Sequence, residues 1–167
     1  MERWPPPRYQ IQIDFHAPLD FVYRWCTDYG SDDARRSGDE YERRVVQRTS
    51  RRVVIEDLWW ESDGWRWRRS EVMLRPPNRW EAMSFGNVRD ARIEYHLTAL
   101  SPDRTRLNLR MRRRPGVRNR KQAPKKAMEE ELRHMWGKFG KSLEKDYQRS
   151  RDAGSVSKRT GRSRRKI

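Results

Sequence analysis

The sequence of 167 residues contains little cysteine and little histidine, and both shortages exclude kinds of site. Its single cysteine, Cys26, excludes an intramolecular disulfide and a cysteine-rich zinc module. Its three histidines, His16, His96 and His134, show none of the spacings that are typical of metal centres. A P-loop, a dinucleotide fingerprint and a nucleophile elbow are also missing from the sequence. We therefore expect no metal ion and no cofactor.

Long apolar runs are missing as well. The sequence has no stretch of 18 or more apolar residues, which excludes a membrane-spanning helix. Residues 1–8 hold a tryptophan, three prolines and charged residues where a secretory signal would have an apolar region. We therefore expect a soluble protein of the cytoplasm.

Most of the chain has a net charge close to zero, and nearly all of the net positive charge lies toward the C-terminus. Residues 1–109 carry 19 basic and 18 acidic side chains, whereas residues 110–167 carry 21 basic and 6 acidic ones. The whole chain therefore has a net charge of +16. Such an asymmetry is typical of a basic surface or tail that has an anionic partner. A tail that only raises solubility would show the same pattern, so both interpretations stay open.

Aromatic residues are plentiful, with 8 Trp, 6 Tyr and 4 Phe, and apolar residues alternate with polar ones in several segments. This alternation predicts strands, and turn signals such as Ser62-Asp63-Gly64 separate them. The predicted strands cover residues 9–15, 41–49, 52–61, 65–74, 80–85, 91–100 and 105–111. Because short turns join six of the seven, we expect an antiparallel meander with one face exposed to water.

Other segments show helical spacing. Pro18 suits the first turn of a short helix that should end near residues 28–30, and residues 30–40 suit an exposed loop or a loose second helix. Pro124 opens a long helix whose apolar stripe runs as far as Tyr147. Beyond it the apolar periodicity is lost, so we expect an N-terminal extension over residues 1–8, one domain over 9–149 and a disordered basic tail over 150–167.

Several short motifs accompany this order of elements. They are Ile11-Gln12-Ile13-Asp14-Phe15-His16-Ala17-Pro18, Phe21-Val22-Tyr23, Cys26-Thr27-Asp28, Asp63-Gly64 and Ser101-Pro102-Asp103-Arg104-Thr105. Over about residues 9–149 the chain resembles the START-like (SRPBCC) superfamily of polyketide cyclases/dehydrases and lipid-transport proteins. The resemblance implies an α+β helix-grip fold, in which a seven-stranded antiparallel curved sheet wraps around the C-terminal helix. It also implies short helical segments between the first two strands and a cavity between sheet and helix that can hold an apolar ligand.

The residues expected to line such a cavity are apolar and lie on the inward stripe of the long helix or on strands. They are Trp67, Tyr95, Leu107, Leu109, Met128, Leu132, Met135, Trp136 and Phe139. Their broad, polarizable surface favours binding or transport of a hydrophobic small molecule, such as a lipid, a quinone or a polyketide-like compound. Core packing alone would select the same residues.

Two other functions remain open. A cyclase/dehydratase-like enzyme would need a polar pair inside the cavity, and Arg69 and Glu71 are the candidates because alternation places them on one strand face with Trp67. Cross-strand ion pairing on the wet face would explain the same two residues without catalysis. A basic protein that associates with nucleic acid or a membrane surface would use Arg112–Lys121 and the tail. The sequence leaves the oligomeric state open.

Overall fold

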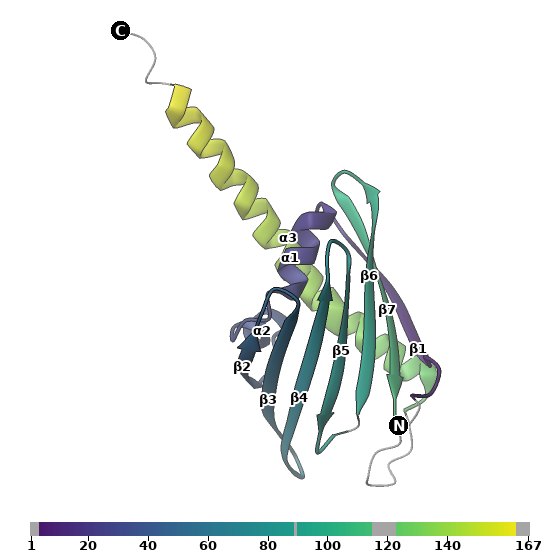
Figure 1. Ribbon diagram of the computed structural model, residues 1–167. Helices are drawn as coiled ribbons and strands as arrows, with labels where there is room; N and C mark the ends of the chain where they lie inside the picture. Colours follow the sequence, from purple (N-terminus) through teal and green to yellow (C-terminus); the bar gives the residue numbers. More distant parts are fainter. Residues whose placement is uncertain (1–3, 89, 115–122, 163–167) are drawn as a thin grey trace.

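The computed structural model describes residues 4–88, 90–114 and 123–162, with side chains described as far as Ala153. Its strands form one antiparallel sheet (Figure 1). They are β1 (Tyr9–Phe15), β2 (Glu42–Arg48), β3 (Arg52–Glu61), β4 (Gly64–Arg75), β5 (Arg79–Gly86), β6 (Ala91–Ser101) and β7 (Arg104–Arg113). All seven predicted strands are confirmed, and their ends differ from the prediction by two residues at most.

The strands lie in the order β1-β7-β6-β5-β4-β3-β2, so β2 to β7 form the expected meander. β1 pairs with β7, where Tyr9 lies opposite Met111 and Phe15 lies opposite Thr105. Strands β1 and β2 are therefore the two edge strands, on opposite edges of the sheet. Helices α1 (Leu19–Thr27) and α2 (Asp33–Ser37) connect these two strands, and they confirm the short helical segments that were expected there.

The sequence sets the limits of both short helices. Pro18 is the N-cap of α1, where its missing N–H leaves no hydrogen bond unmade. Gly38 ends α2 in the left-handed conformation, with a φ of 71°, and its N–H donates to the Ala34 carbonyl. Glycine adopts that conformation at little cost because it has no Cβ atom.

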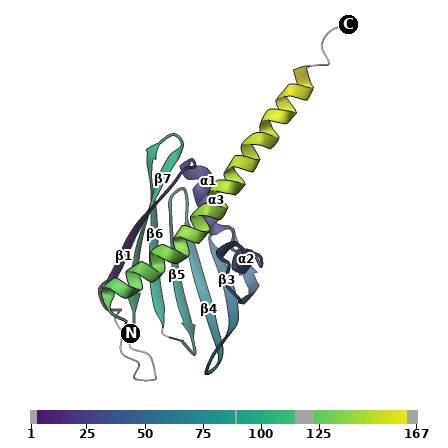
Figure 2. The ribbon, with the colours of Figure 1, turned by 180° about the vertical axis from the view of Figure 1, so that it is seen from behind.

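Helix α3 (Lys125–Arg162) crosses one face of the sheet diagonally and packs mainly on β1, with further contacts to α1 and α2. Figure 2 shows the three helices on the same side of the sheet. We call the face that they cover the inner face, and the opposite one the outer face. At Gly140 the helix approaches β1 so closely that a Cβ atom would lie 3.2 Å from the Phe15 ring.

The far end of α3 differs from the sequence-based expectation. We expected disorder from Ser150, but the helix continues to Arg162 and projects away from the sheet (Figure 1). Extending an existing helix costs little, and pairs along it support the extension: Arg149 lies 3.7 Å from Asp146, and Gln148 donates to Asp152. Residues 163–167 lie outside the described part of the chain, and the domain boundary near Arg149 stays a prediction.

The hydrophobic core lies between the inner face and the apolar stripe of α3. Leu97, Leu107 and Leu109 contribute from the strands, whereas Leu132 and Leu143 contribute from the helix. Leu107 and Leu109 lie two positions apart on β7, as the alternation predicted. This arrangement fixes which side chains of β5, β6 and α3 meet, and those side chains form the candidate site.

Candidate ligand site between sheet and helix

A group of aromatic rings occupies the middle of the space between the inner face and α3. Trp80 on β5 and Tyr95 on β6 stack with ring centroids 4.7 Å apart, because cross-strand pairing places them side by side. Tyr95 meets Trp136 of α3 at 5.9 Å, and Tyr23 of α1 meets Trp80 at 5.9 Å. Trp136 also lies 5.6 Å from Phe139. These contacting rings, together with Trp25 of α1 described below, are called the interior aromatic cluster.

Three polar atoms of this cluster are buried without a hydrogen-bond partner among the residues that the structure describes: the Tyr23 hydroxyl, the Trp80 Nε1–H and the Trp136 Nε1–H. The Trp80 N–H interacts with the nearby Tyr29 hydroxyl, which leaves the Tyr23 hydroxyl and the Trp136 N–H as donors for a ligand. Burial also raises the pKa of Tyr23, so the hydroxyl keeps its proton and remains a donor. A buried donor without a partner typically costs about 1–3 kcal/mol. An acceptor atom from outside the protein would remove that cost.

The structure brings together most of the residues that were predicted to bind a ligand. Those in or against the core are Tyr95, Leu107, Leu109, Met128, Leu132, Met135, Trp136 and Phe139. The rings among them are in contact, so the protein's own side chains fill the central part of the expected cavity. Five of them are buried, and Tyr95, Met135 and Phe139 are partly buried against the core. Their role in ligand binding stays a prediction.

Trp67 does not belong to this group. It lies on the outer face and is 49% exposed, so its assignment to the cavity lining was wrong. The register explains the error, because Trp67 pairs with the exposed Leu58, whereas its neighbour Arg68 pairs with the buried Asp57. Alternation identified the two faces of β4 correctly but could not tell which of them faces α3.

The candidate catalytic pair, Arg69 and Glu71, lies on the same outer face. Arg69 pairs with Glu56 at 3.2 Å, and Glu71 pairs with Arg52 at 2.7 Å. Both are the cross-strand ion pairs that the simpler interpretation described. The enzymatic interpretation therefore loses the two residues on which it rested.

The charged residues that do face inward were not predicted as a site. Asp57 is 2% exposed, and its carboxylate accepts two hydrogen bonds from Arg43, at 2.7 and 2.9 Å. Arg68 donates to the same carboxylate at 2.8 Å. Asp33 of α2 pairs with the opposite side of Arg43. We call Asp33, Arg43, Asp57 and Arg68 the inner ionic cluster. The sequence signal that could have revealed it is the position of Asp57 between the apolar residues Ile55 and Trp59 on β3.

The protonation of this cluster follows from its contacts. Burial alone would raise the pKa of Asp57, but the hydrogen bonds and charges of Arg43 and Arg68 keep it below its ordinary value. Burial raises the pKa of Asp33, although Arg43 opposes this effect. Burial also raises the pKa of Tyr41, which lies under the Arg43 guanidinium, to about 12. Asp57 is therefore ionised at neutral pH and unsuited to be a general acid.

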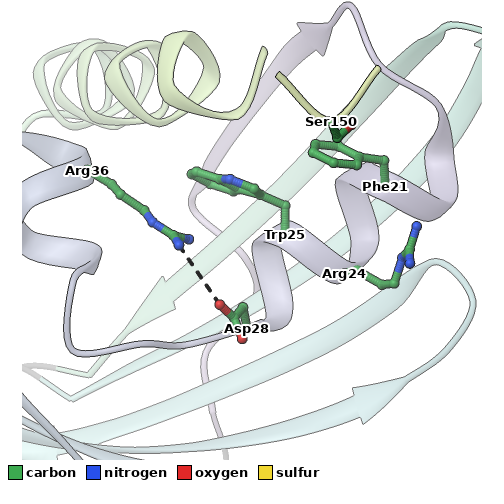
Figure 3. Close-up of a pocket in the computed structure, with 6 residues that line it drawn as sticks. All are labelled: Phe21, Arg24, Trp25, Asp28, Arg36 and Ser150. Atoms are coloured by element: carbon green, nitrogen blue, oxygen red, sulfur yellow. Dashed lines mark ion pairs between the residues drawn. The ribbon is translucent and has the colours of Figure 1, made fainter. Parts of the chain in front are cut away.

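A surface hollow of about 430 Å³ lies where α1, α2 and α3 meet (Figure 3). It is lined by Phe21, Arg24, Trp25, Asp28, Arg36 and Ser150. Trp25 forms its inner wall and is held by a 3.0 Å hydrogen bond from its Nε1 to Asp146 and by the Arg36 guanidinium over its ring. The other side of Trp25 meets Phe139 at 6.0 Å. The hollow and the interior aromatic cluster thus share one wall.

The remaining polar candidates have structural roles or lie apart from this region. Burial and the nearby Asp33 raise the pKa of the Cys26 thiol, which suits an inert thiol in the core. His134 is exposed on α3, and His96 lies 3.3 Å from the Asn78 amide. Within the described ranges, no three His, Cys, Asp or Glu side chains are grouped as metal ligands would be.

None of the helices in the described part of the chain is both long and apolar enough to cross a membrane.

No protein-family model and no curated protein matches the sequence. Solved structures do match. The di-domain ARO/CYC StfQ from the steffimycin biosynthetic pathway is 14% identical with a TM-score of 0.66, over 84% of this chain and 46% of that chain. This chain thus spans about half the length of that protein.

Two single-domain structures match over almost their whole length. The Zhui aromatase/cyclase from Streptomyces sp. R1128 is 12% identical with a TM-score of 0.62, over 84% of this chain and 92% of that one. A START superfamily protein from Mycobacterium smegmatis is 12% identical with a TM-score of 0.61, over 84% and 96%. At such identities the likeness establishes the fold alone, and the chain has the START-like (SRPBCC) helix-grip fold.

Proposed function

We propose that the protein binds a hydrophobic small molecule between the inner face of the sheet and α3. The observation that carries this proposal is the pair of buried donors, the Tyr23 hydroxyl and Trp136 Nε1–H, which lack partners in the described ranges. Each donor belongs to a ring that meets a neighbouring aromatic ring edge to face, and such a lining would bind a flat apolar molecule. A carbonyl oxygen on that molecule would accept from a donor that otherwise stays unpaired. A quinone or a polyketide-like compound therefore fits better than a plain hydrocarbon chain.

The surface hollow is the proposed entrance. Its volume of about 430 Å³ lies within the range of small-molecule pockets, which is roughly 300–1,000 Å³. Trp25 separates it from Phe139, and Phe139 in turn contacts Trp136. Because the central rings are in contact, a ligand enters by displacing Trp25 and Phe139 toward the solvent side. The hydrogen bond from Trp25 to Asp146 is the contact that this movement breaks.

Binding or transport is favoured over catalysis. The similar structures include proteins named as aromatase/cyclases, which keeps a cyclase as the second candidate. The charges of Arg43 and Arg68 in the inner ionic cluster act on Tyr95 of the interior aromatic cluster, and both arginines engage the ionised Asp57. Arg68 retains a buried Nε–H without a partner in the described structure, so it would hold a ligand oxygen rather than transfer a proton. Binding needs only these donors, whereas turnover needs a proton-transfer group in addition.

A titration with a matched pair of ligands tests the proposal. Tryptophan fluorescence of the full chain is followed during addition of anthraquinone and of anthracene, which has the same rings without the oxygens. We expect tighter binding of anthraquinone, and a loss of about 2- to 10-fold in its affinity when Tyr23→Phe removes one donor. Tyr9→Phe is the control, because the Tyr9 hydroxyl already donates to the Ala123 carbonyl outside the cluster. Absence of binding to both ligands, with no apolar molecule in a native mass spectrum of the purified protein, would contradict it.

Association with an anionic surface is a separate proposal, as is a cytoplasmic location. Most of the segment Arg112–Lys121 lies outside the described residues, and Arg112 itself pairs with Glu94. The C-terminal end of α3 projects from the domain, which suits contact with a membrane or a nucleic acid (Figure 1). Truncation after Arg149 should weaken binding to anionic vesicles or to RNA in a salt-dependent way. Unchanged binding would leave this end of the chain without that role.

A further inference from the structure

The outer face of β3, β4 and β5 carries a group of exposed apolar side chains. Trp60, Trp65 and Trp67 are 60%, 58% and 49% exposed, and Phe85 and Leu58 are 42% and 39% exposed. Register makes them neighbours, since Trp60 lies opposite Trp65 and Leu58 lies opposite Trp67. The rings of Trp60 and Trp65 meet edge to face at 5.2 Å. We call these five residues the outer aromatic patch.

The patch is large for a surface that only faces water. Four aromatic side chains that are about half exposed leave on the order of 400 Å² of ring surface in solvent. Contiguous apolar patches of this size usually mark an interaction site in soluble proteins. The helices described here all lie on the other side of the sheet, so none of them covers the patch (Figure 2).

Charges of both signs border the patch. The Glu56 carboxylate lies between Arg44, at 2.6 Å, and Arg69, at 3.2 Å, and these two arginine side chains are 75% and 53% exposed. Glu42 is exposed beside Leu58, its cross-strand partner. A face with interspersed charges can complement a second copy of itself under a two-fold axis. A uniformly anionic partner would meet Glu42 and Glu56 as well as the arginines.

The adjacent sheet edge is poorly suited to extending the sheet. β2 is the outermost strand, and a bulge between Val45 and Gln47 interrupts its register with β3. Bulges of this kind hinder continuous pairing with another strand. Two copies would therefore meet face to face across the patch rather than edge to edge.

We propose that the outer aromatic patch is the interface of a symmetric dimer of this chain. Tryptophan and arginine dominate the residues that stabilise protein interfaces, and here both lie on one face. The aromatic rings would form the dry centre of each half, and the rim of Arg44, Arg69 and Glu42 would supply the rest of the roughly 800 Å² that each partner of a stable complex buries. The proposal is independent of the ligand site, which lies on the opposite face.

Sedimentation velocity of the full chain at micromolar concentrations tests this dimer. We expect wild-type protein to sediment with twice the chain mass of 20.4 kDa. Trp65→Lys should weaken self-association by about 30-fold or more. Leu100→Lys is the matched control, because Leu100 is a similarly exposed apolar residue, at 42%, on the β6–β7 hairpin. Thermal melts verify that both variants fold.

Two results would overturn the proposal. One is a wild-type protein that stays monomeric over the whole concentration range. The other is a dimer that Trp65→Lys and Trp60→Lys both leave intact. If the protein is monomeric and binds phosphatidylserine vesicles, and Trp65→Lys abolishes that binding, the patch contacts a membrane instead. That outcome also rules out the dimer.

Discussion

Strand β7 and the β3–β4 hairpin differ in the kind of residue that points toward the helices. On β7, Leu107 and Leu109 point toward α3 and are buried, and polar residues alternate with them. On the β3–β4 hairpin, the charged Asp57 points inward and the apolar Trp60 and Trp65 point outward. The first region follows the usual pattern of an antiparallel sheet, whereas the second inverts it.

The contrast shows that hydrophobicity alone does not decide which face is buried. The carboxylate of Asp57 accepts from two arginines, so its burial leaves no unpaired charge. Once that ion cluster faces inward, the period of two places Trp60, Trp65 and Trp67 outward, whereas Trp59 shares the inner face with Asp57. The following experiments test each side of the contrast, in order of the effect expected.

The largest effect is expected in the apolar region. Trp136→Ala removes a side chain that is 8% exposed and packed against Phe15, Tyr95 and Phe139. The free energy of unfolding should fall by roughly 3–5 kcal/mol, because a cavity remains where the ring was. Urea denaturation measures this loss, with the exposed Trp65→Ala as the control. Equal, small losses for both variants would mean that Trp136 only lines an open space.

The inverted region offers an adjacent pair of acids on opposite faces. Asp57→Asn leaves Arg43 and Arg68 without their carboxylate inside the protein, and should cost about 3 kcal/mol of stability. Glu56→Gln breaks the equivalent contacts with Arg44 and Arg69 on the outer face, and should cost less than about 1 kcal/mol. Similar losses for the two variants would contradict the difference in burial.

The pH dependence of the Asp57→Asn variant sharpens the same test. The pKa of Asp57 lies below its ordinary value of 3.8 in the folded chain, so its ionised form stabilises the fold above that pH. This contribution is lost as the pH falls through the lowered pKa. The stability difference between wild type and Asp57→Asn should therefore shrink in strong acid. Asp33 acts in the opposite direction, because burial raises its pKa.

Two tyrosines on the inner side should differ by a smaller amount. Tyr9→Phe removes a hydroxyl that donates to the Ala123 carbonyl at 3.2 Å, and should cost about 1 kcal/mol. Tyr23→Phe removes a buried hydroxyl that lacks a partner among the described residues, so stability should stay the same or rise slightly. Chemical denaturation distinguishes them. A clear loss in Tyr23→Phe would show that its hydroxyl has a partner.

The smallest effect concerns His96 on β6. Burial, and then the charge of Arg79, lower its pKa below the ordinary value of 6.5. The unfolded chain therefore binds a proton more readily, and stability should decrease slightly as the pH falls below 6.5. His96→Gln should remove this slope in melting temperature against pH, whereas the exposed His134→Gln should keep it. An identical slope in wild type and His96→Gln would contradict the burial of His96.

Much of the fold could be predicted from the sequence because its signals are local. Alternation in residues 105–111 identified β7 and its buried leucines, and the stripe from Met128 to Tyr147 identified the face of α3 that packs on the sheet. The sequence could not decide which face of β4 is inner, because that depends on Arg43, a residue of β2, reaching Asp57. The continuation of α3 past Ser150 was missed for a related reason, since charged residues extend an existing helix without any apolar pattern.

The candidate site was predictable only in part. Trp136, Phe139 and Tyr95 were recognised from their spacing, and the structure places them in contact. The unpaired Tyr23 hydroxyl had no sequence signal, because its lack of a partner depends on the packing of α1 against β5. Trp25 as a wall of the surface hollow likewise follows from its hydrogen bond to Asp146, which is distant in the sequence.

The most direct test of the proposed function follows the indole N–H signals of the 8 tryptophans by ¹H–¹⁵N NMR during addition of anthraquinone. Trp136→Phe assigns the signal of interest. We predict that the Trp136 signal moves downfield as its Nε1–H donates to the ligand carbonyl, and that anthracene produces no such shift. The signals of the exposed Trp60, Trp65 and Trp67 should stay in place. Shifts confined to those three, or no shift of Trp136 at saturation, would contradict a ligand site between the sheet and α3.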